Sequence, residues 1–250
     1  MIQASYLESR KNMPSKGQEV VMPITILECP PLRVYSIRFY KKDSNNNLII
    51  AKEIVSENID KVLKRKISLP KQKKTKEKIE EINANNFDDI RAVVYSQPKL
   101  TNIGKKKPEL FEMGLGGKSI NEKLAYVKSI MNKEIFVSDI FKENDLVDVH
   151  AVSKGKGTQG SVKRFGIGIR FHKSEKTKRG PGSLGSWEVR GKKSWTVAHP
   201  GQTGYHLRTE FNKVLVKIIK SNSVQELNPK GGIKRYGVIK TDAILLKGSI

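Results

Sequence analysis

A glycine- and lysine-rich stretch over residues 154–194 constrains this chain more than any other feature of its sequence. It holds few large aliphatic side chains, so it cannot bury enough apolar surface to form a core of its own. It also opens a strongly cationic region, because residues 154–220 contain 16 lysines and arginines but only three acidic residues. The core must therefore come from the flanking segments, and residues 154–194 form a loop or an extension that leaves it.

The charge of the whole chain indicates a polyanionic partner. The formal net charge is +23, and a compact protein with that excess repels itself unless a partner neutralises it. Nucleic acid is the commonest such partner. An anionic membrane surface and an acidic protein are weaker alternatives.

Aromatic residues distinguish the cationic stretch from an ordinary charged linker. Phe165, Phe171, Trp187, Trp195 and Tyr205 stand among its glycines and lysines. A charge run is usually a solvated linker, but tryptophan is costly to leave in one. Glycine lets the backbone approach phosphates, cations release counterions, and aromatic rings stack on unpaired bases. We therefore favour an extension that RNA orders over a solvated linker.

Alternating apolar residues predict strands on both sides of this stretch. Before it, residues 22–28 and 33–40 alternate and are separated by Pro30-Pro31. A turn over 43–47 then leads into a short strand over 47–55. Later strands are expected over 146–152, 211–219 and 236–248.

The middle of the chain predicts helices as well as strands. Residues 73–86 carry helix-forming side chains, with Ile79 and Ile82 on one face. Residues 88–98 return to strand-like composition. A helix is expected over 120–131, where Ser119 and Glu122 have the spacing of a capping box and Leu124, Val127 and Met131 recur at helical intervals.

These patterns predict a mainly β fold with a discontinuous core. We expect a β-barrel-like domain from residues 1–40 and 145–250, and an α+β insertion over 41–144. Residues 154–210 would form the basic extension from the barrel.

One glycine motif raises the possibility of an enzyme. Gly155, Gly157 and Gly160 have the GxGxxG spacing of a dinucleotide-binding loop. That fingerprint requires a following helix, whereas the sequence here continues with further glycines and shows no helical stripe. We therefore give the nucleotide-binding interpretation little weight.

Other reactive side chains are equally isolated. His150, His172, His199 and His206 have no nucleophile and orienting group in a recognisable arrangement. Cys29 is the one cysteine, so no intrachain disulfide can form and no zinc-type spacing exists. No apolar run approaches the roughly 20 residues of a membrane span. We expect a soluble cytoplasmic protein that is not an enzyme and takes no metal or cofactor.

Several strings resemble motifs of the ribosomal protein L-three family, in the same order and over nearly the whole chain. The insertion is more similar to the archaeal form of the family than to the eukaryotic form. The strings are PITILECPPLRVYSIRFY (23–40), KKPELFEMGLGGKSINEKLAYVKSIMNKEI (106–135), VDVHAVSKGKGTQGSVKRFGI (147–167), GSLGSW (182–187), SWTVAHPGQTGYHLRTEFNK (194–213) and NPKGGIKRYGVIKTDAILLKGSI (228–250).

The resemblance implies a fold and a role. The fold is a six-stranded translation-protein β-barrel, interrupted by an α+β insertion, with a basic finger that reaches through RNA toward the peptidyl-transferase centre. The role is structural, in the large ribosomal subunit, with binding of 23S-type ribosomal RNA early in assembly. Neighbouring proteins such as the L-fourteen family are implied as partners, and no membrane or small-molecule substrate is.

The expected RNA-binding residues combine the cationic stretch with the family motifs. On the resemblance, Trp187 is the finger-tip residue that stacks or wedges against bases. The full set is Lys154, Lys156, Lys163, Arg164, Lys173, Lys176, Lys178, Arg179, Trp187, Arg190, Lys192, Lys193, Trp195, Gln202, Tyr205, His206, Arg208, Lys230, Lys234 and Arg235.

The chain departs from the family pattern at the finger. The tip reads Trp187-Glu188-Val189 where the family usually has Trp-His-Pro, and the arm before it is shorter, which implies a shorter finger. Lys178 falls near the place of a histidine that is methylated in some relatives. The basic N-terminal extension and the Pro- and Lys-rich C-terminal tail of archaeal relatives do not show in this sequence.

Two other functions stay open at this point. The chain could be a free RNA-binding factor for ribosome assembly, which the sequence barely separates from a ribosomal constituent. It could also be a nucleotide-binding enzyme that uses Gly155, Gly157 and Gly160.

Overall fold

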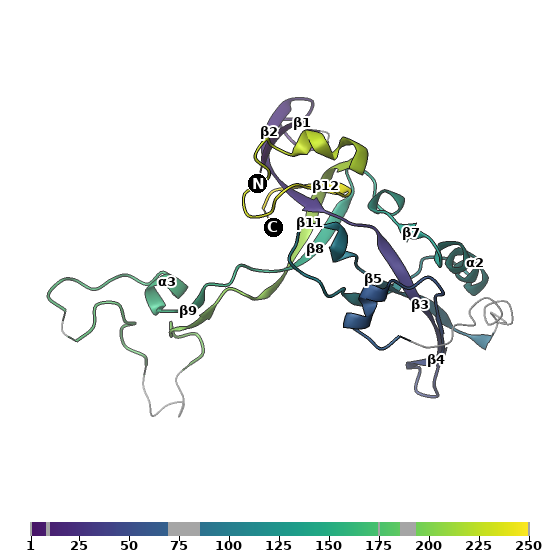
Figure 1. Ribbon diagram of the computed structural model, residues 1–250. Coiled ribbons are helices and arrows are strands. Elements are labelled where there is room, and N and C mark those ends of the chain that lie inside the picture. Colours follow the sequence, from purple (N-terminus) through teal and green to yellow (C-terminus); the bar gives the residue numbers. More distant parts are fainter. Residues whose placement is uncertain (1, 9–10, 70–85, 175, 186–193, 250) are drawn as a thin grey trace. The chain divides into compact units, whose positions relative to one another are not determined.

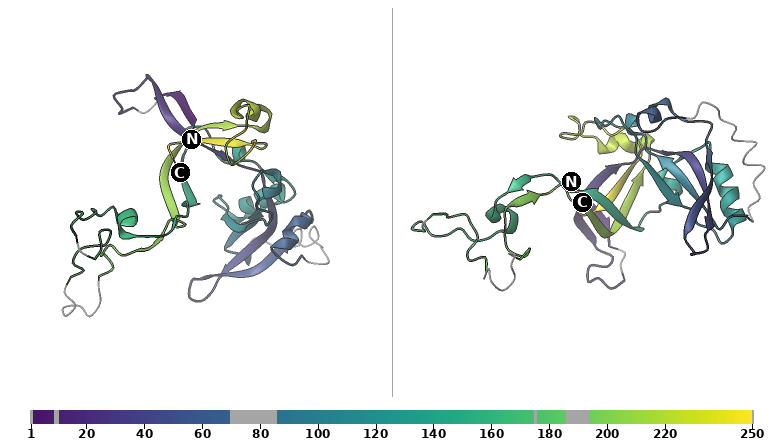
Figure 2. Two further views of the ribbon diagram at one scale, coloured as in Figure 1. Left: turned by 60° about the vertical axis from the view of Figure 1, so that its left-hand side comes forward. Right: turned by 90° about the horizontal axis from the view of Figure 1, so that it is seen from below.

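The computed structural model describes residues 2–8, 11–69, 86–174, 176–185 and 194–249. The chain divides into two compact units. The core unit comprises Met1–Leu146 and Val214–Ser249, and the extension unit comprises Val147–Lys213. Strand residues outnumber helix residues in both units, so the predicted mainly β class is confirmed (Figure 1 and Figure 2).

The first sheet has five strands, in the order β1, β2, β12, β11 and β8. Their bounds are Ile2–Leu7, Glu19–Glu28, Ala243–Lys247, Leu207–Ile219 and Leu146–Val152. β2 and β12 pair antiparallel with Glu28 opposite Ala243, which joins the two ends of the sequence. β11 supplies its residues from Val214 onward to the core unit and its earlier residues to the extension unit. A closed six-stranded barrel is a finer statement than this sheet and stays a prediction.

Alternation in the sequence sets the two faces of the first sheet. In β2, Met22 and Ile24 are buried, while Val21 and Pro23, which precede each of them, are exposed, as the period of two requires. Leu246 of β12 and Leu215 of β11 lie opposite each other and are both fully buried. The predicted strand pattern therefore reports the buried face correctly.

The second sheet also lies in the core unit and has the order β4, β3, β5 and β6, with β7 paired to β3. The bounds are Leu48–Val55, Leu32–Lys42, Asp89–Tyr95, Leu110–Gly114 and Glu134–Ile135. The strand predicted over 33–40 is confirmed as β3, and the chain passes from the first sheet to the second at Pro30-Pro31. The division into a barrel of residues 1–40 and 145–250 and an insertion over 41–144 stays a prediction.

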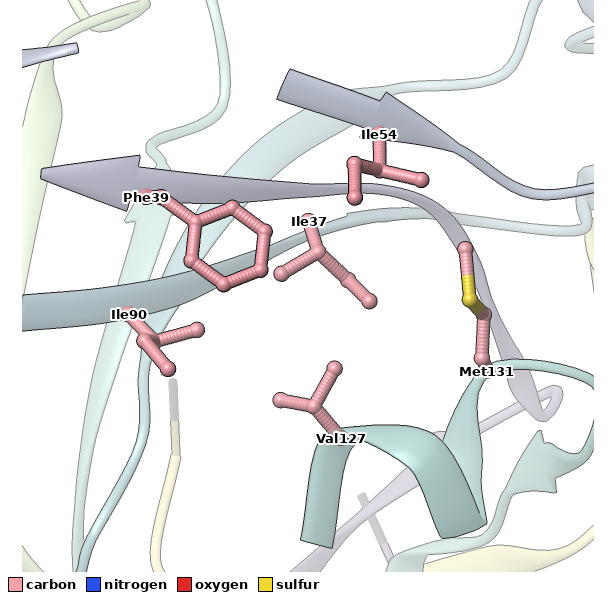
Figure 3. Close-up of a cluster of buried hydrophobic side chains, with 6 residues drawn as sticks. All are labelled: Ile37, Phe39, Ile54, Ile90, Val127 and Met131. Carbon is pink, nitrogen blue, oxygen red and sulfur yellow. The ribbon is translucent and has the colours of Figure 1, made fainter. Parts of the chain in front are cut away.

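Helix α2 (Ile120–Ile130) packs on one face of the second sheet. Figure 3 shows Val127 and Met131, from the helical segment, directed toward Ile37, Phe39, Ile54 and Ile90 on the strands. All six side chains are at most 5% exposed. Full burial of one such side chain stabilises the fold by about 1.5–3 kcal/mol, so this cluster anchors the sheet.

The start of α2 confirms half of the predicted capping box. The Ser119 hydroxyl accepts from the backbone N–H of Glu122 at 3.3 Å. The Glu122 carboxylate accepts from the N–H of Lys118 at 3.0 Å, one residue earlier than the pattern requires. The helix therefore begins where the sequence predicts.

Other predictions need correction. The strand expected over 236–248 is confined to Ala243–Lys247. β1 and β6 were not predicted, and the helix expected over 73–86 lies, apart from Asn86, outside the described residues.

The 3-10 helices span Lys61–Arg65 (η1), Pro98–Leu100 (η3), Val137–Asp139 (η4) and Ser221–Leu227 (η5).

The missing part of the last strand has a clear physical cause. The carboxylate of Glu28 accepts from the backbone N–H groups of Lys240 at 2.7 Å and Thr241 at 3.0 Å, and from the Tyr236 hydroxyl. The backbone N–H groups of Lys240 and Thr241 are therefore not available for a sheet ladder. Residues 236–241 form a loop tied to the end of β2.

Candidate nucleic-acid interface

Two antiparallel arms form the base of the extension unit. β9 (Gly157–Gln159) pairs with β10 (Gly201–Thr203). Below this short ladder, the N–H of Lys156 donates to the Thr203 carbonyl at 3.0 Å, and the N–H of Tyr205 donates to the Ser153 carbonyl at 3.1 Å. The outgoing and returning arms are thus joined by backbone hydrogen bonds rather than by an apolar core.

Glycine at position 204 permits this close approach. Its φ is +74°, in the region that disfavours side chains, and a Cβ there would lie 2.0 Å from the Lys154 carbonyl oxygen. The neighbouring Tyr205 also has a positive φ of 57°, and its side chain is 76% exposed. Lys154 and Tyr205 therefore lie where the backbones of the two arms approach each other closely.

A one-turn helix, α3 (Ser161–Phe165), is fastened to the returning arm. The Ser161 hydroxyl donates to the Ala198 carbonyl at 2.6 Å, and the Arg164 guanidinium donates to the His199 carbonyl at 2.8 Å. Arg164 also lies over the Phe165 ring at 5.0 Å. Arg164, expected to contact RNA, thus already makes contacts that hold the two arms together.

Helix α3 corrects the expectation that no helix follows Gly155, Gly157 and Gly160. It has only five residues, and the strand before it pairs antiparallel with β10. The dinucleotide fingerprint instead requires a parallel βαβ unit with a full helix. The glycine motif therefore shapes the arms and gives no support to a nucleotide site.

The cations of the extension unit are exposed and have few acidic neighbours. Within its described residues, the one ion pair joins Lys213 to Glu210 at 3.2 Å. The predicted site cations that the structure places on its surface are Lys154, Lys156, Lys163, Arg164, Lys173, Lys176, Lys178, Arg179 and Arg208. Such an uncompensated group of like charges favours a polyanionic ligand.

Large aromatic side chains are exposed among these cations. Trp195 is 90% exposed and Phe171 is 87% exposed, while Phe165 and Phe211 are also on the surface. Gln202 is exposed and His206 is half-buried. The extension unit therefore presents aromatic rings as well as cations to a ligand.

The sequence prediction missed two residues of this surface. Phe171 was noted among the aromatics but not chosen as a contact, although it is almost fully exposed. Arg170 fixes the loop around it, because its guanidinium donates to the Pro181 carbonyl at 2.8 Å and its N–H donates to the Lys178 carbonyl at 3.0 Å. Neither contact has a local sequence signal.

Not every predicted residue can be placed in the extension unit. Trp187, Arg190, Lys192 and Lys193 lie outside the described residues. Lys230, Lys234 and Arg235 are exposed on the core unit. The RNA-binding role of the whole set therefore stays a prediction.

The described residues show neither a metal centre nor a membrane span. They contain no group of three or more His, Cys, Asp and Glu side chains that could share a metal ion. None of the helices among them is both long and apolar enough to cross a membrane.

Comparisons with known proteins identify the family. The family model for Ribosomal protein L3 matches residues 7–250. The large ribosomal subunit protein uL3 of Methanosphaera stadtmanae is 45% identical over 254 residues, which cover 100% of this chain and 75% of that protein. The uL3 protein of Methanocaldococcus jannaschii gives the same identity and coverage. That of Archaeoglobus fulgidus is 42% identical over 98% of this chain and 73% of its own length. Because the family model covers nearly the whole chain and these archaeal relatives are at least 42% identical to it, the chain belongs to the ribosomal protein L3 family, in its archaeal form.

Proposed function

We propose that this chain is a structural constituent of the large ribosomal subunit and binds large-subunit ribosomal RNA through its extension unit. The family consists of structural proteins rather than enzymes, and the relatives above are named as large-subunit proteins. The observation that supports RNA binding is the exposed surface of the extension unit. It combines exposed cations that, apart from Lys213, have no ion-pair partner among the described residues with exposed aromatic rings.

The physical chemistry of that surface fits RNA better than solvent. Exposing Trp195 and Phe171 to water is unfavourable, whereas stacking an aromatic ring on an unpaired base contributes about 1–3 kcal/mol. Each lysine that binds a phosphate releases condensed counterions. Both gains are realised only when a nucleic acid covers the surface.

The finer parts of the proposal follow from the family resemblance. The first sheet would belong to a six-stranded barrel, and residues 154–210 would form a finger directed toward the peptidyl-transferase centre. Trp187 would stand at its tip. The protein would join the subunit early in assembly, in the cytoplasm, beside proteins such as the L-fourteen family.

A salt titration of RNA binding tests the role of the extension unit. The probe is a transcript of the large-subunit ribosomal RNA of Methanocaldococcus jannaschii. In the variant Lys154→Ala/Lys156→Ala/Lys163→Ala, the slope of log K against log salt should fall by about 2 to 3, because each phosphate contact contributes about 0.7–0.9. A matched variant, Lys41→Ala/Lys128→Ala/Lys133→Ala, removes three exposed lysines of the core unit and should leave the slope nearly unchanged. Equal slopes for the two variants would refute the assignment.

Sedimentation separates a ribosomal constituent from an assembly factor. A tagged chain expressed in an archaeal cell should stay with mature large subunits after a salt wash. Recovery only with immature particles would replace the proposal with the assembly-factor function.

A further inference from the structure

Two loops that are far apart in the sequence meet in the core unit. The Asn102 side-chain amide donates to the Val238 carbonyl at 2.6 Å. This contact joins residues 99–107, here called the first loop, to residues 228–240, here called the second loop. Ile103 from the first loop and Ile233 from the second line the same cavity.

The cavity has an apolar wall and a volume of about 630 Å³. Its one lining carboxylate, Glu28, already accepts hydrogen bonds from the hydroxyl of Tyr236 and from the backbone of Lys240 and Thr241. The cavity therefore offers no unpaired negative charge to a ligand. The main apolar lining residues are Ile2, Ile26, Ile103, Ile233, Tyr236 and Ile239.

Exposed cations lie on both loops and are here called the rim cations. Lys234 itself lines the cavity. None of the rim cations makes an ion pair with another residue in the described parts of the chain, whereas Lys105 nearby is paired with Glu109. The rim cations are Lys99, Lys106, Lys107, Lys230, Lys234 and Arg235.

A tight turn presents two of these cations. The N–H of Tyr236 donates to the Ile233 carbonyl at 3.0 Å, which leaves Lys234 and Arg235 at the tip of the turn. Arg235 has a φ of +66°, a conformation that glycine adopts without strain. The second loop uses glycine at Gly232 and Gly237, both with positive φ, but carries arginine at the tip. The charge at the tip of this turn therefore comes with a conformational cost.

We propose that this cavity takes an unpaired base of ribosomal RNA while the rim cations bind the phosphates on either side of it. This second RNA contact rests on the proposed function but uses a surface outside the extension unit. An apolar recess suits the faces of a base, and the surrounding cations suit a polyphosphate backbone. An acidic protein segment would match the cations but not the recess.

The first experiment compares rim lysines with matched lysines. The complete chain and the ribosomal RNA transcript described above are used at several salt concentrations. In Lys106→Ala/Lys107→Ala/Lys234→Ala, the affinity should fall about tenfold or more, and the salt slope should decrease by about 2 to 3. The Lys41→Ala/Lys128→Ala/Lys133→Ala variant should bind like the natural chain. Circular dichroism checks that each variant is folded.

The second experiment tests the recess without changing any charge. Ile103 is 52% exposed, so Ile103→Ser should leave the fold intact, weaken RNA binding about threefold to tenfold and keep the salt slope. Ile140 is 47% exposed elsewhere in the core unit and provides the control Ile140→Ser. Arg235→Gly should raise the melting temperature and still weaken RNA binding.

The outcomes separate this inference from the proposed function. If the extension variant loses affinity but the rim variant binds like its matched control, the second contact is overturned. Polyglutamate and polyuridylate are compared as competitors at equal total charge. If polyglutamate displaces the transcript from the rim cations as effectively as polyuridylate does, an acidic protein replaces RNA as the ligand. If the natural chain does not bind the transcript at all, the proposed function fails and this inference fails with it.

Discussion

Replacing Gly204 with alanine tests how the arms of the extension unit are held together. The backbone at this position has a φ of +74°. An added Cβ would lie 2.0 Å from the carbonyl oxygen of Lys154 and 3.1 Å from the amide nitrogen of Lys156. Both atoms belong to the backbone, so no side-chain movement can relieve the clash, and the arms must separate.

The size of the effect follows from the contacts that are lost. A left-handed conformation costs a residue with a Cβ roughly 1–2 kcal/mol. Separation of the arms breaks the hydrogen bonds from Lys156 to Thr203 and from Tyr205 to Ser153, each worth about 0.5–1.5 kcal/mol. Gly204→Ala should therefore destabilise the paired arms by about 2–5 kcal/mol.

Amide hydrogen exchange measures this local cost. The N–H groups of Lys156 and Tyr205 should exchange roughly thirtyfold faster or become unprotected, while the core unit keeps its protection and melting temperature. Gly168→Ala is the control, since no atom lies within 4 Å of its added Cβ and its φ is not positive. If both variants show the same protection as the natural chain, the close approach at Gly204 does not hold the arms.

Three further predictions concern the core unit. Burial works to raise the pKa of Glu28, but hydrogen bonds from Tyr236, Lys240 and Thr241 outweigh it and hold the pKa below its usual value. Glu28 therefore stabilises the fold above the pKa it has in the unfolded chain, and this contribution is lost as pH falls through the folded pKa. Glu28→Gln should show a smaller loss of melting temperature between pH 6 and pH 3 than the natural chain. Leu246→Ala removes a fully buried side chain and should lower the free energy of unfolding by about 2–5 kcal/mol in a urea titration, and a loss below 1 kcal/mol would contradict its place in the core. Ser119→Ala removes the cap of α2 and should cost about 1 kcal/mol by the same titration, with Ser119→Asp as the variant that retains it.

Local patterns in the sequence predicted the elements whose stability is local. The alternation over residues 22–28 predicted β2, in which Met22 and Ile24 are buried. The spacing of Ser119 and Glu122 predicted the start of α2. In both cases the deciding interactions lie within a few residues, so the sequence carries them directly.

The errors occur where distant residues decide the structure. Residues 236–242 have strand-like composition, but Glu28, more than 200 positions away, accepts from the backbone N–H groups of Lys240 and Thr241. The strand over 33–40 was predicted correctly as a strand, yet its sheet depends on pairing with β5, which no local pattern encodes. Helix α3 is too short for a helical stripe and depends on Arg164 and Ser161 reaching the returning arm. The candidate site was predictable by charge and composition, but its internal contacts were not.

The acidic residues of the core unit form ion pairs with some of its cations. The cations without such partners determine how RNA binding depends on salt. On the second sheet and the helix that covers it, several cations are paired with carboxylates, as in the pairs of Arg38 with Glu112 at 3.1 Å and Lys123 with Asp89 at 2.8 Å. The cations of the extension unit and of the two loops have almost no such partners among the described residues. These two surfaces therefore each carry a group of cations without ion-pair partners among the described residues. A matched cation releases no additional counterions when RNA approaches, because its charge is already compensated. The salt dependence of RNA binding should consequently follow the number of unpaired cations on these two surfaces, and removing paired lysines such as Lys123 should alter stability without altering that dependence.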